Sequence, residues 1–303
     1  MSFDRLQQKI DTLKNPTVVG LDPALEHVPP EILDKHIAAH GETLQAAAQA
    51  VLEFNKGLID AVCDIVPAVK PQSAYYEALG PDGVAALKMT CDYAKSRGMY
   101  VILDGKRNDI GSTASAYSAA YFGSVKVGGT EISAFDVDAL TINAYLGSDG
   151  VLPFLKTATE CDKAMFALVK TSNPSAGELQ DKFIGEDRLY TVVGDLLENI
   201  SHETIGQYGF SRIGAVVGAT YPEELEFLRA RLKHTFFLVP GYGAQGGAAA
   251  DVAHAFDKDG RGAIINSSRG IIAAWKKTGA DYKESARAEA LRMRDELRGV
   301  VYA

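Results

Sequence analysis

Eight short runs of apolar and β-branched residues recur along the 303-residue chain, each followed by a longer stretch with helical character. Strands that are buried on both faces read as continuous apolar runs, and they are typical of parallel sheets covered by helices. Eight such units favour a closed (β/α)8 TIM barrel, which we predict as a single domain over residues 1–303. The alternative is a doubly wound open sheet, but no GxGxxG motif follows the first run, which weakens it.

The predicted strands are TVVGLD (17–22), IVPAVK (65–70), MYVILD (99–104), DALTIN (138–143), AMFALVKT (164–171), RIGAVVG (212–218), TFFLVP (235–240) and GAIINS (262–267). The predicted helices cover 42–63, 82–97, 111–122, 148–158, 188–208, 222–232, 247–257 and 281–298.

Charge and composition exclude several classes of partner. The net charge is -8 and there is no run of Lys or Arg, which argues against nucleic acid or an anionic membrane as a partner. The polar amino terminus does not resemble a signal peptide, and no apolar stretch reaches the ~20 residues of a membrane span. Cys63, Cys91 and Cys161 are widely spaced, so we predict small buried thiols in a reduced, cytoplasmic compartment.

Six of the eight predicted strands end in, or are followed at once by, side chains that can do chemistry. A single polar residue at a strand end is usually a turn or cap residue. In a barrel, however, the carboxyl ends of all strands meet at one mouth, where active sites are built. Six such ends together therefore predict a site. These residues are Asp22, Lys70, Asp104, Asn143, Thr171 with Ser172, and Asn266 to Arg269.

The third predicted strand ends in LDGKRNDIGSTA (103–114), which places a lysine close to two carboxylates. Because side chains alternate along a strand, Asp104 and Lys106 are expected to point the same way, with Asp109 following as the chain turns into a helix. A surface ion-pair cluster with Asp109 as a helix cap is the plain alternative. Two nearby carboxylates favour the ammonium form of Lys106, which suits a proton donor and disfavours a Schiff-base aldolase.

DGKRNDIGST resembles the D-x-K-x-x-D-I-x-x-T signature of the orotidine 5'-phosphate decarboxylases, in particular their longer bacterial subgroup. The resemblance continues along most of the chain, in the same order as the strands. The further similar motifs are GLDP (20–23), VKPQ (69–72), TSNPS (171–175), VPGYGAQGG (239–247) and NSSRG (266–270).

The resemblance implies decarboxylation of orotidine 5'-phosphate to uridine 5'-phosphate, the last step of de novo pyrimidine synthesis, with no cofactor and no metal. It implies that Lys106 protonates C6, that Asp104 lies against the substrate carboxylate, and that Lys70 bridges Asp104 and the ribose. Asp109, the fourth catalytic residue, is expected to enter the site of a neighbouring subunit, which implies a homodimer with shared active sites.

The implied substrate contacts lie on several strand ends. Asp22 and Thr113 would bind ribose hydroxyls, with Thr113 also acting in the neighbouring site, and Ser172 would bind the pyrimidine. Gln245 and Arg269 would bind the phosphate, which agrees with the usual phosphate position in barrels, after strands seven and eight.

Two other functions stay open from the residues alone. The first is a metal-dependent sugar-phosphate decarboxylase or lyase of the same barrel suprafamily, which shares the DxKxxD pattern. Enzymes of that kind resemble one another in an acidic metal ligand at the end of the second strand, where this chain has Lys70. A non-catalytic nucleotide-phosphate sensor predicts a degraded lysine network, whereas Lys70, Asp104, Lys106 and Asp109 are all present.

Overall fold

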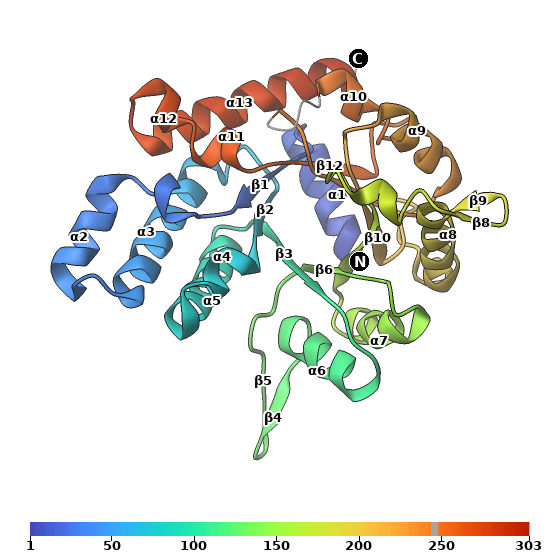
Figure 1. The fold of residues 1–303 in the computed structure, drawn as a ribbon, viewed down its shortest axis with the longest axis horizontal. Coiled ribbons are helices and arrows are strands. Elements are labelled where there is room, and N and C mark those ends of the chain that lie inside the picture. Colours follow the sequence, from blue (N-terminus) through green and yellow to red (C-terminus); the bar gives the residue numbers. More distant parts are fainter. Residues whose placement is uncertain (244–247, 303) are drawn as a thin grey trace.

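The computed structural model describes residues 1–243 and 248–302, and its centre is a closed barrel of eight parallel strands (Figure 1). The barrel strands are β1 (Thr17–Leu21), β2 (Ala68–Pro71), β3 (Tyr100–Arg107), β6 (Ala139–Ile142), β7 (Ala164–Lys170), β10 (Ile213–Val217), β11 (Phe237–Val239) and β12 (Ala263–Ser267). Each pairs with its successor along the chain, and β1 closes the barrel by pairing with β12 as well as β2. The predicted TIM barrel is confirmed, and the open-sheet alternative is wrong.

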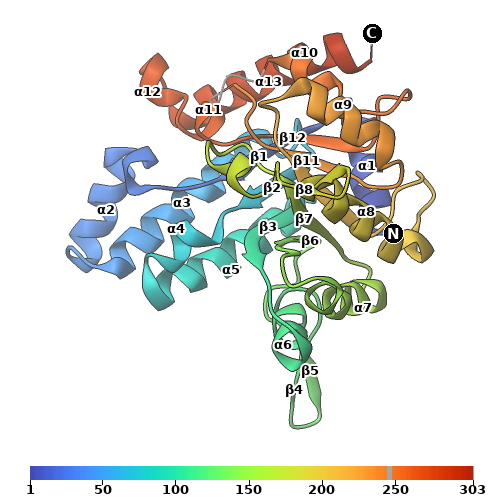
Figure 2. The ribbon, with the colours of Figure 1, turned by 45° about the vertical axis from the view of Figure 1, so that its right-hand side comes forward.

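Helices surround the barrel in both ribbon views (Figures 1 and 2). The predicted helices are found as α3 (Leu44–Val62), α5 (Gly80–Ser96), α6 (Gly111–Tyr121), α7 (Leu152–Glu160), α8 (Leu189–Ser201), α9 (Pro222–Arg231), α10 (Ala249–Ala253) and α13 (Tyr282–Val301). Of these, α10 is much shorter than the predicted 247–257, and residue 247 lies outside the described residues.

Several elements were not expected from the sequence. The additional helices are α1 (Ser2–Leu13), α2 (Pro30–His40), α4 (Ser73–Glu77), α11 (Arg269–Ile272) and α12 (Trp275–Thr278), with 3-10 turns at Leu25–His27 and Ala176–Glu178. Two more 3-10 turns, Ser148–Gly150 and His202–Thr204, lie within the predicted helices 148–158 and 188–208, which are α-helical only in part. Two small hairpins pair β4 (Val125–Val127) with β5 (Thr130–Ile132), and β8 (Phe183–Ile184) with β9 (Asp187–Arg188). The first hairpin projects away from the barrel in both views (Figures 1 and 2).

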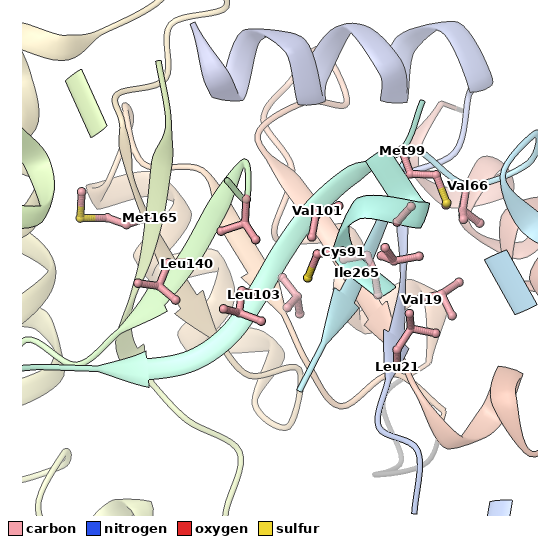
Figure 3. Packing of buried hydrophobic residues seen from close by; sticks show 14 of the residues in the cluster. Val19, Leu21, Val66, Cys91, Met99, Val101, Leu103, Leu140, Met165 and Ile265 are labelled. Carbon is pink, nitrogen blue, oxygen red and sulfur yellow. The ribbon is translucent and has the colours of Figure 1, made fainter. Parts of the chain in front are cut away.

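The barrel strands are buried on both faces, which explains their continuous apolar sequences. In β3, Ile102 belongs to a cluster inside the barrel, whereas Val101 and Leu103 belong to a larger cluster between the barrel and the helices. Figure 3 shows part of this outer cluster, with Leu103 beside Leu140 of the paired strand β6. Because one face fills the barrel and the other binds helices, polar side chains are left chiefly to the strand ends.

Helix α1 closes the amino-terminal end of the barrel. Phe3 packs into the inner cluster, with ring centroids 4.9 Å from Phe166 and 5.0 Å from Phe236. The buried side chain of Gln7 accepts a hydrogen bond from the backbone N–H of Gly262, which precedes β12. A ligand that approaches the barrel axis must therefore enter at the carboxyl ends of the strands.

The cysteines only partly match the prediction of three buried thiols. Cys91 is buried, and burial raises its pKa to about 12, but Cys63 is half-buried and Cys161 is exposed. The prediction was wrong for Cys161 because this residue ends α7 at a surface turn instead of packing inside. Among the helices of the described residues, none is both long and apolar enough to span a membrane.

Candidate active site

The carboxyl-terminal mouth of the barrel contains a cavity of about 710 Å³. All eight barrel strands contribute residues from their carboxyl-terminal parts or from the loops that follow. Six of the predicted site residues line this cavity: Asp22, Lys70, Asp104, Lys106, Ser172 and Arg269. Asp22 and Arg269, 247 positions apart in the sequence, thus share one pocket only because the strand ends converge.

Asp104, at the end of β3, receives four hydrogen bonds. Its Oδ1 accepts one from Lys106 Nζ at 2.7 Å and one from Thr141 Oγ1 at 2.8 Å. Its Oδ2 accepts one from Lys70 Nζ at 2.8 Å and one from Gln72 Nε2 at 2.9 Å. Four donors saturate the two oxygens of a carboxylate, so this side chain has a single well-defined orientation.

Electrostatics keeps the two buried members of this network charged. Burial by itself would raise the pKa of Asp104, but the charges of Lys70 and Lys106 outweigh it and hold that pKa well below its usual range. Burial would likewise lower the pKa of Lys70, yet Asp104 and Asp22 raise it above the ordinary value. The site therefore holds a buried carboxylate and a buried ammonium at neutral pH.

This buried pair should make a measurable contribution to stability. In Asp104→Asn, Lys70 loses its buried partner, so we expect the free energy of unfolding to fall by roughly 3–5 kcal/mol. The difference in unfolding free energy between wild type and Asp104→Asn should be fully present above about pH 4, the ordinary pKa of an unfolded aspartate. The reason is that the native carboxyl of Asp104 titrates at lower pH than the unfolded one. Below that pH, wild type should progressively lose its advantage. Denaturant unfolding from pH 3 to 7 measures both effects, and a difference independent of pH would refute the assignment.

Lys106 has an unusual backbone for a non-glycine residue. Its φ is 45°, in the left-handed region, which costs an L-residue about 1–2 kcal/mol. The expected contact with Asp104 is present, but regular alternation along the strand does not produce it, because β3 is irregular between Leu103 and Arg107. Strained backbone of this kind clusters at functional sites, where surrounding contacts hold it in place.

Asp109 and Thr113 are not among the residues that line the cavity of their own chain. Asp109 Oδ1 accepts a hydrogen bond from the backbone N–H of Ile110, and Thr113 is exposed on the first turn of α6. Two carboxylates were expected beside Lys106. Among the described residues of one chain, Lys106 forms an ion pair with Asp104 and not with Asp109. Gln245, predicted to bind phosphate, lies outside the described residues.

Sequence reasoning missed Gln72 and Thr141, both of which donate hydrogen bonds to Asp104. Thr141 was detectable in principle as a polar residue inside the apolar run DALTIN, and Gln72 as the last residue of VKPQ. It also missed Gln180, whose side chain accepts from the backbone N–H of Thr171 at 2.9 Å and donates to its hydroxyl at 2.7 Å. Gln180 thereby ties the long loop after β7 to the cavity wall.

The cavity wall also contains polar atoms without protein partners. Asp22 Oδ1 and Asn266 Oδ1 are buried and have no hydrogen-bond donor among the described residues, although Lys70 Nζ lies 4.0 Å from the former. Unpaired buried acceptors are unfavourable unless a ligand or water satisfies them. Over residues 1–243 and 248–302, no three His, Cys, Asp or Glu side chains are grouped as metal ligands would be.

A closed eight-stranded barrel with a lysine–carboxylate network at its carboxyl mouth is a (β/α)8-barrel enzyme with a polar, charge-rich site. Residues 53–283 match the family described as Orotidine 5'-phosphate decarboxylase / HUMPS family. The chain belongs to this family, which confirms the resemblance to a family of carboxy-lyases.

Individual relatives cover nearly the whole chain. An orotidine 5'-phosphate decarboxylase from Rhodopirellula baltica is 42% identical over 290 residues, which are 93% of this chain and 94% of the relative. One from Caldicellulosiruptor saccharolyticus is 39% identical, with 93% of each chain covered. The structure of Leishmania donovani OMP decarboxylase is similar with a TM-score of 0.74 and 31% identity, covering 100% of this chain and 99% of that one.

Proposed function

We propose that this chain converts orotidine 5'-phosphate to uridine 5'-phosphate and carbon dioxide, in the cytoplasmic synthesis of pyrimidines, without a metal or organic cofactor. The observation that carries the proposal is the placement of Asp104 between the ammonium groups of Lys70 and Lys106 in the cavity wall. A fixed ammonium supplies both positive charge and a proton where negative charge develops on carbon.

The chemistry makes heavy demands on electrostatic stabilisation. Loss of carbon dioxide from C6 leaves an electron pair in the plane of the pyrimidine ring, where the π system cannot accept it. Enzymes lower barriers by roughly 8–23 kcal/mol, and this reaction needs a value toward the upper end. We assign Lys106 to stabilise this pair and then to protonate it. The N–H bond of Lys106 breaks as the C6–H bond forms, and the resulting amine takes a new proton from solvent.

Asp104 has two roles in this proposal. It keeps Lys70 and Lys106 in their ammonium forms, and it lies against the carboxylate that the substrate loses. Its low pKa supports both roles, because the carboxylate then stays charged at neutral pH even though the residue is only 7% exposed. Lys70 offsets the charge of Asp104 and reaches toward Asp22.

The remaining polar residues are assigned to substrate groups. The unpaired Oδ1 of Asp22 supports its role as an acceptor for ribose hydroxyls. The positions of Ser172 and Arg269 in the cavity wall support contacts with the pyrimidine and the phosphate, respectively. The assignments of Thr113 to ribose and Gln245 to phosphate rest on the sequence motifs.

We further propose a homodimer whose active sites are shared. Asp109 and Thr113 lie outside their own cavity, at the start of α6, where Ile110 is 53% exposed. An open groove of about 940 Å³ with mostly apolar lining runs beside them, between α6, α7 and α8. Large exposed apolar surfaces mark protein interaction sites, and a second copy seated here would receive Asp109 and Thr113.

Activity should survive exhaustive chelation. We expect the purified protein to consume orotidine 5'-phosphate, followed by its absorbance, at the same rate before and after treatment with a chelator and without added pyridoxal or thiamine phosphates. Lys106→Ala, treated identically, is the control showing that the activity belongs to this site. A reproducible requirement for Mg²⁺ or Zn²⁺ would favour a sugar-phosphate lyase, and inactivity of the wild type would refute the proposed reaction.

A further inference from the structure

The catalytic segment of β3 is longer than the strand that it faces. Leu103 pairs with Leu140 and Arg107 pairs with Ile142, so three residues of β3 lie opposite Thr141 alone. The ladder resumes immediately afterwards, where the backbone N–H of Asn143 donates to Arg107 O at 3.0 Å. Such bulges redirect side chains and leave backbone groups unpaired. Here the three residues opposite Thr141 are Asp104, Gly105 and Lys106, two more than a regular ladder would place there.

Thr141 bonds one backbone group of the bulge and one side chain. Its hydroxyl accepts from the backbone N–H of Lys106 at 2.9 Å and donates to Asp104 Oδ1 at 2.8 Å. Only 1% of the residue is exposed, so water cannot readily take over either bond. A threonine hydroxyl can donate one hydrogen bond and accept others. This hydroxyl donates to Asp104 and accepts from Lys106, the two central residues of the site.

The two bonds act on different parts of the reaction centre. One holds the amide of Lys106 while its φ is 45°, a conformation that is otherwise unfavourable for lysine. The other holds Asp104 Oδ1, the oxygen that Lys106 Nζ also contacts at 2.7 Å. Thr141 therefore connects the backbone of the lysine to the carboxylate that orients its ammonium group.

We propose that Thr141 is a positioning residue for the decarboxylation, an inference that rests on the proposed function. When Lys106 gives its proton to C6, it becomes a neutral amine and its bond to Asp104 Oδ1 weakens. Thr141 keeps that oxygen in place during this step, so the carboxylate does not rotate toward the departing product. Because the hydroxyl is neutral, it does this without changing the charge balance between Asp104 and the two lysines.

The test compares Thr141→Val, which removes the hydroxyl at nearly constant volume, with Thr141→Ser, which keeps it. Loss of a hydrogen bond to a charged group predicts a decrease in kcat of about 10- to 100-fold for the valine variant. The affinity for uridine 5'-phosphate should change by less than about threefold, because the proposed substrate contacts belong to other residues of the cavity wall, and Thr141, although it lines the cavity, has its hydroxyl bonded to Lys106 and Asp104. The serine variant should recover most of kcat.

Thr90→Val is the matched control, since Thr90 is another fully buried threonine whose hydroxyl bonds Asn55 outside the barrel. It should cost stability without lowering kcat. Unchanged kcat in Thr141→Val, or parallel losses in the valine and serine variants, would overturn the inference. If valine prevents folding, Thr141→Ala and Thr141→Ser make the same comparison. An inactive wild type would instead refute the proposed reaction itself, so the two failures are distinguishable.

Discussion

Mixing two inactive variants should restore about a quarter of wild-type activity. Lys106→Ala removes the proposed proton donor and Asp109→Ala removes the residue proposed to act across the dimer. Each homodimer should lose about 10²- to 10⁴-fold in kcat. After subunit exchange, a mixed dimer has one site with both lesions and one site with neither. Random exchange at equal concentrations makes about half of the dimers mixed, each with one intact site of two, as isologous two-fold symmetry requires.

The structural basis is that Lys106 lines the cavity of its own chain whereas Asp109, three residues later, does not. The matched control mixes Lys106→Ala with Asp104→Ala. Both residues line the same cavity, so every mixed dimer has one lesion in each site and activity should stay at background. Exchange can be verified by native mass spectrometry of differently tagged subunits. Complete exchange with no recovery in the Lys106–Asp109 mixture would show that Asp109 serves its own subunit.

Arg269→Ala should lower kcat/KM for orotidine 5'-phosphate by roughly 10²-fold, about 3 kcal/mol, because a charge-assisted contact with a dianion is lost. Arg269 follows β12, is exposed at the cavity and begins α11. The affinity for uridine, which has no phosphate, should hardly change. Since phosphate binding also contributes to transition-state stabilisation, the loss with the nucleotide should exceed any loss with the nucleoside.

The matched control is Arg261→Ala, which removes an arginine at the opposite end of β12. Arg261 lies before the strand and forms an ion pair with Asp11 of α1 at 3.1 Å, away from the mouth of the barrel. Its removal should leave kcat/KM near the wild-type value. Equal losses for uridine 5'-phosphate and uridine in Arg269→Ala would place this arginine away from the phosphate.

The barrel could be predicted because its strands have a sequence pattern that local physics explains. A strand buried on both faces must be apolar throughout, so all eight runs were recognisable, and their polar ends indicated where the site would form. Six predicted site residues do share one cavity. Helix α1 was missed even though Phe3, Leu6 and Ile10 lie on one face, because its polar residues obscured that pattern. Only closure of the barrel identifies the surface that this face covers.

The details of the site depend on contacts between strands that sequence spacing does not encode. Alternation predicted that Asp104 and Lys106 would point together, but the actual contact depends on a bulge and on a left-handed lysine supported by Thr141 of β6. A buried threonine can bond a bulge in the paired strand or simply fill space. The register between the two strands, here β3 and β6, decides which of the two it does. Hydrophobic patterning therefore determines which strands form and where their polar ends meet. Register and backbone geometry decide which of those polar groups touch, because hydrogen bonds are sensitive to shifts far smaller than one residue.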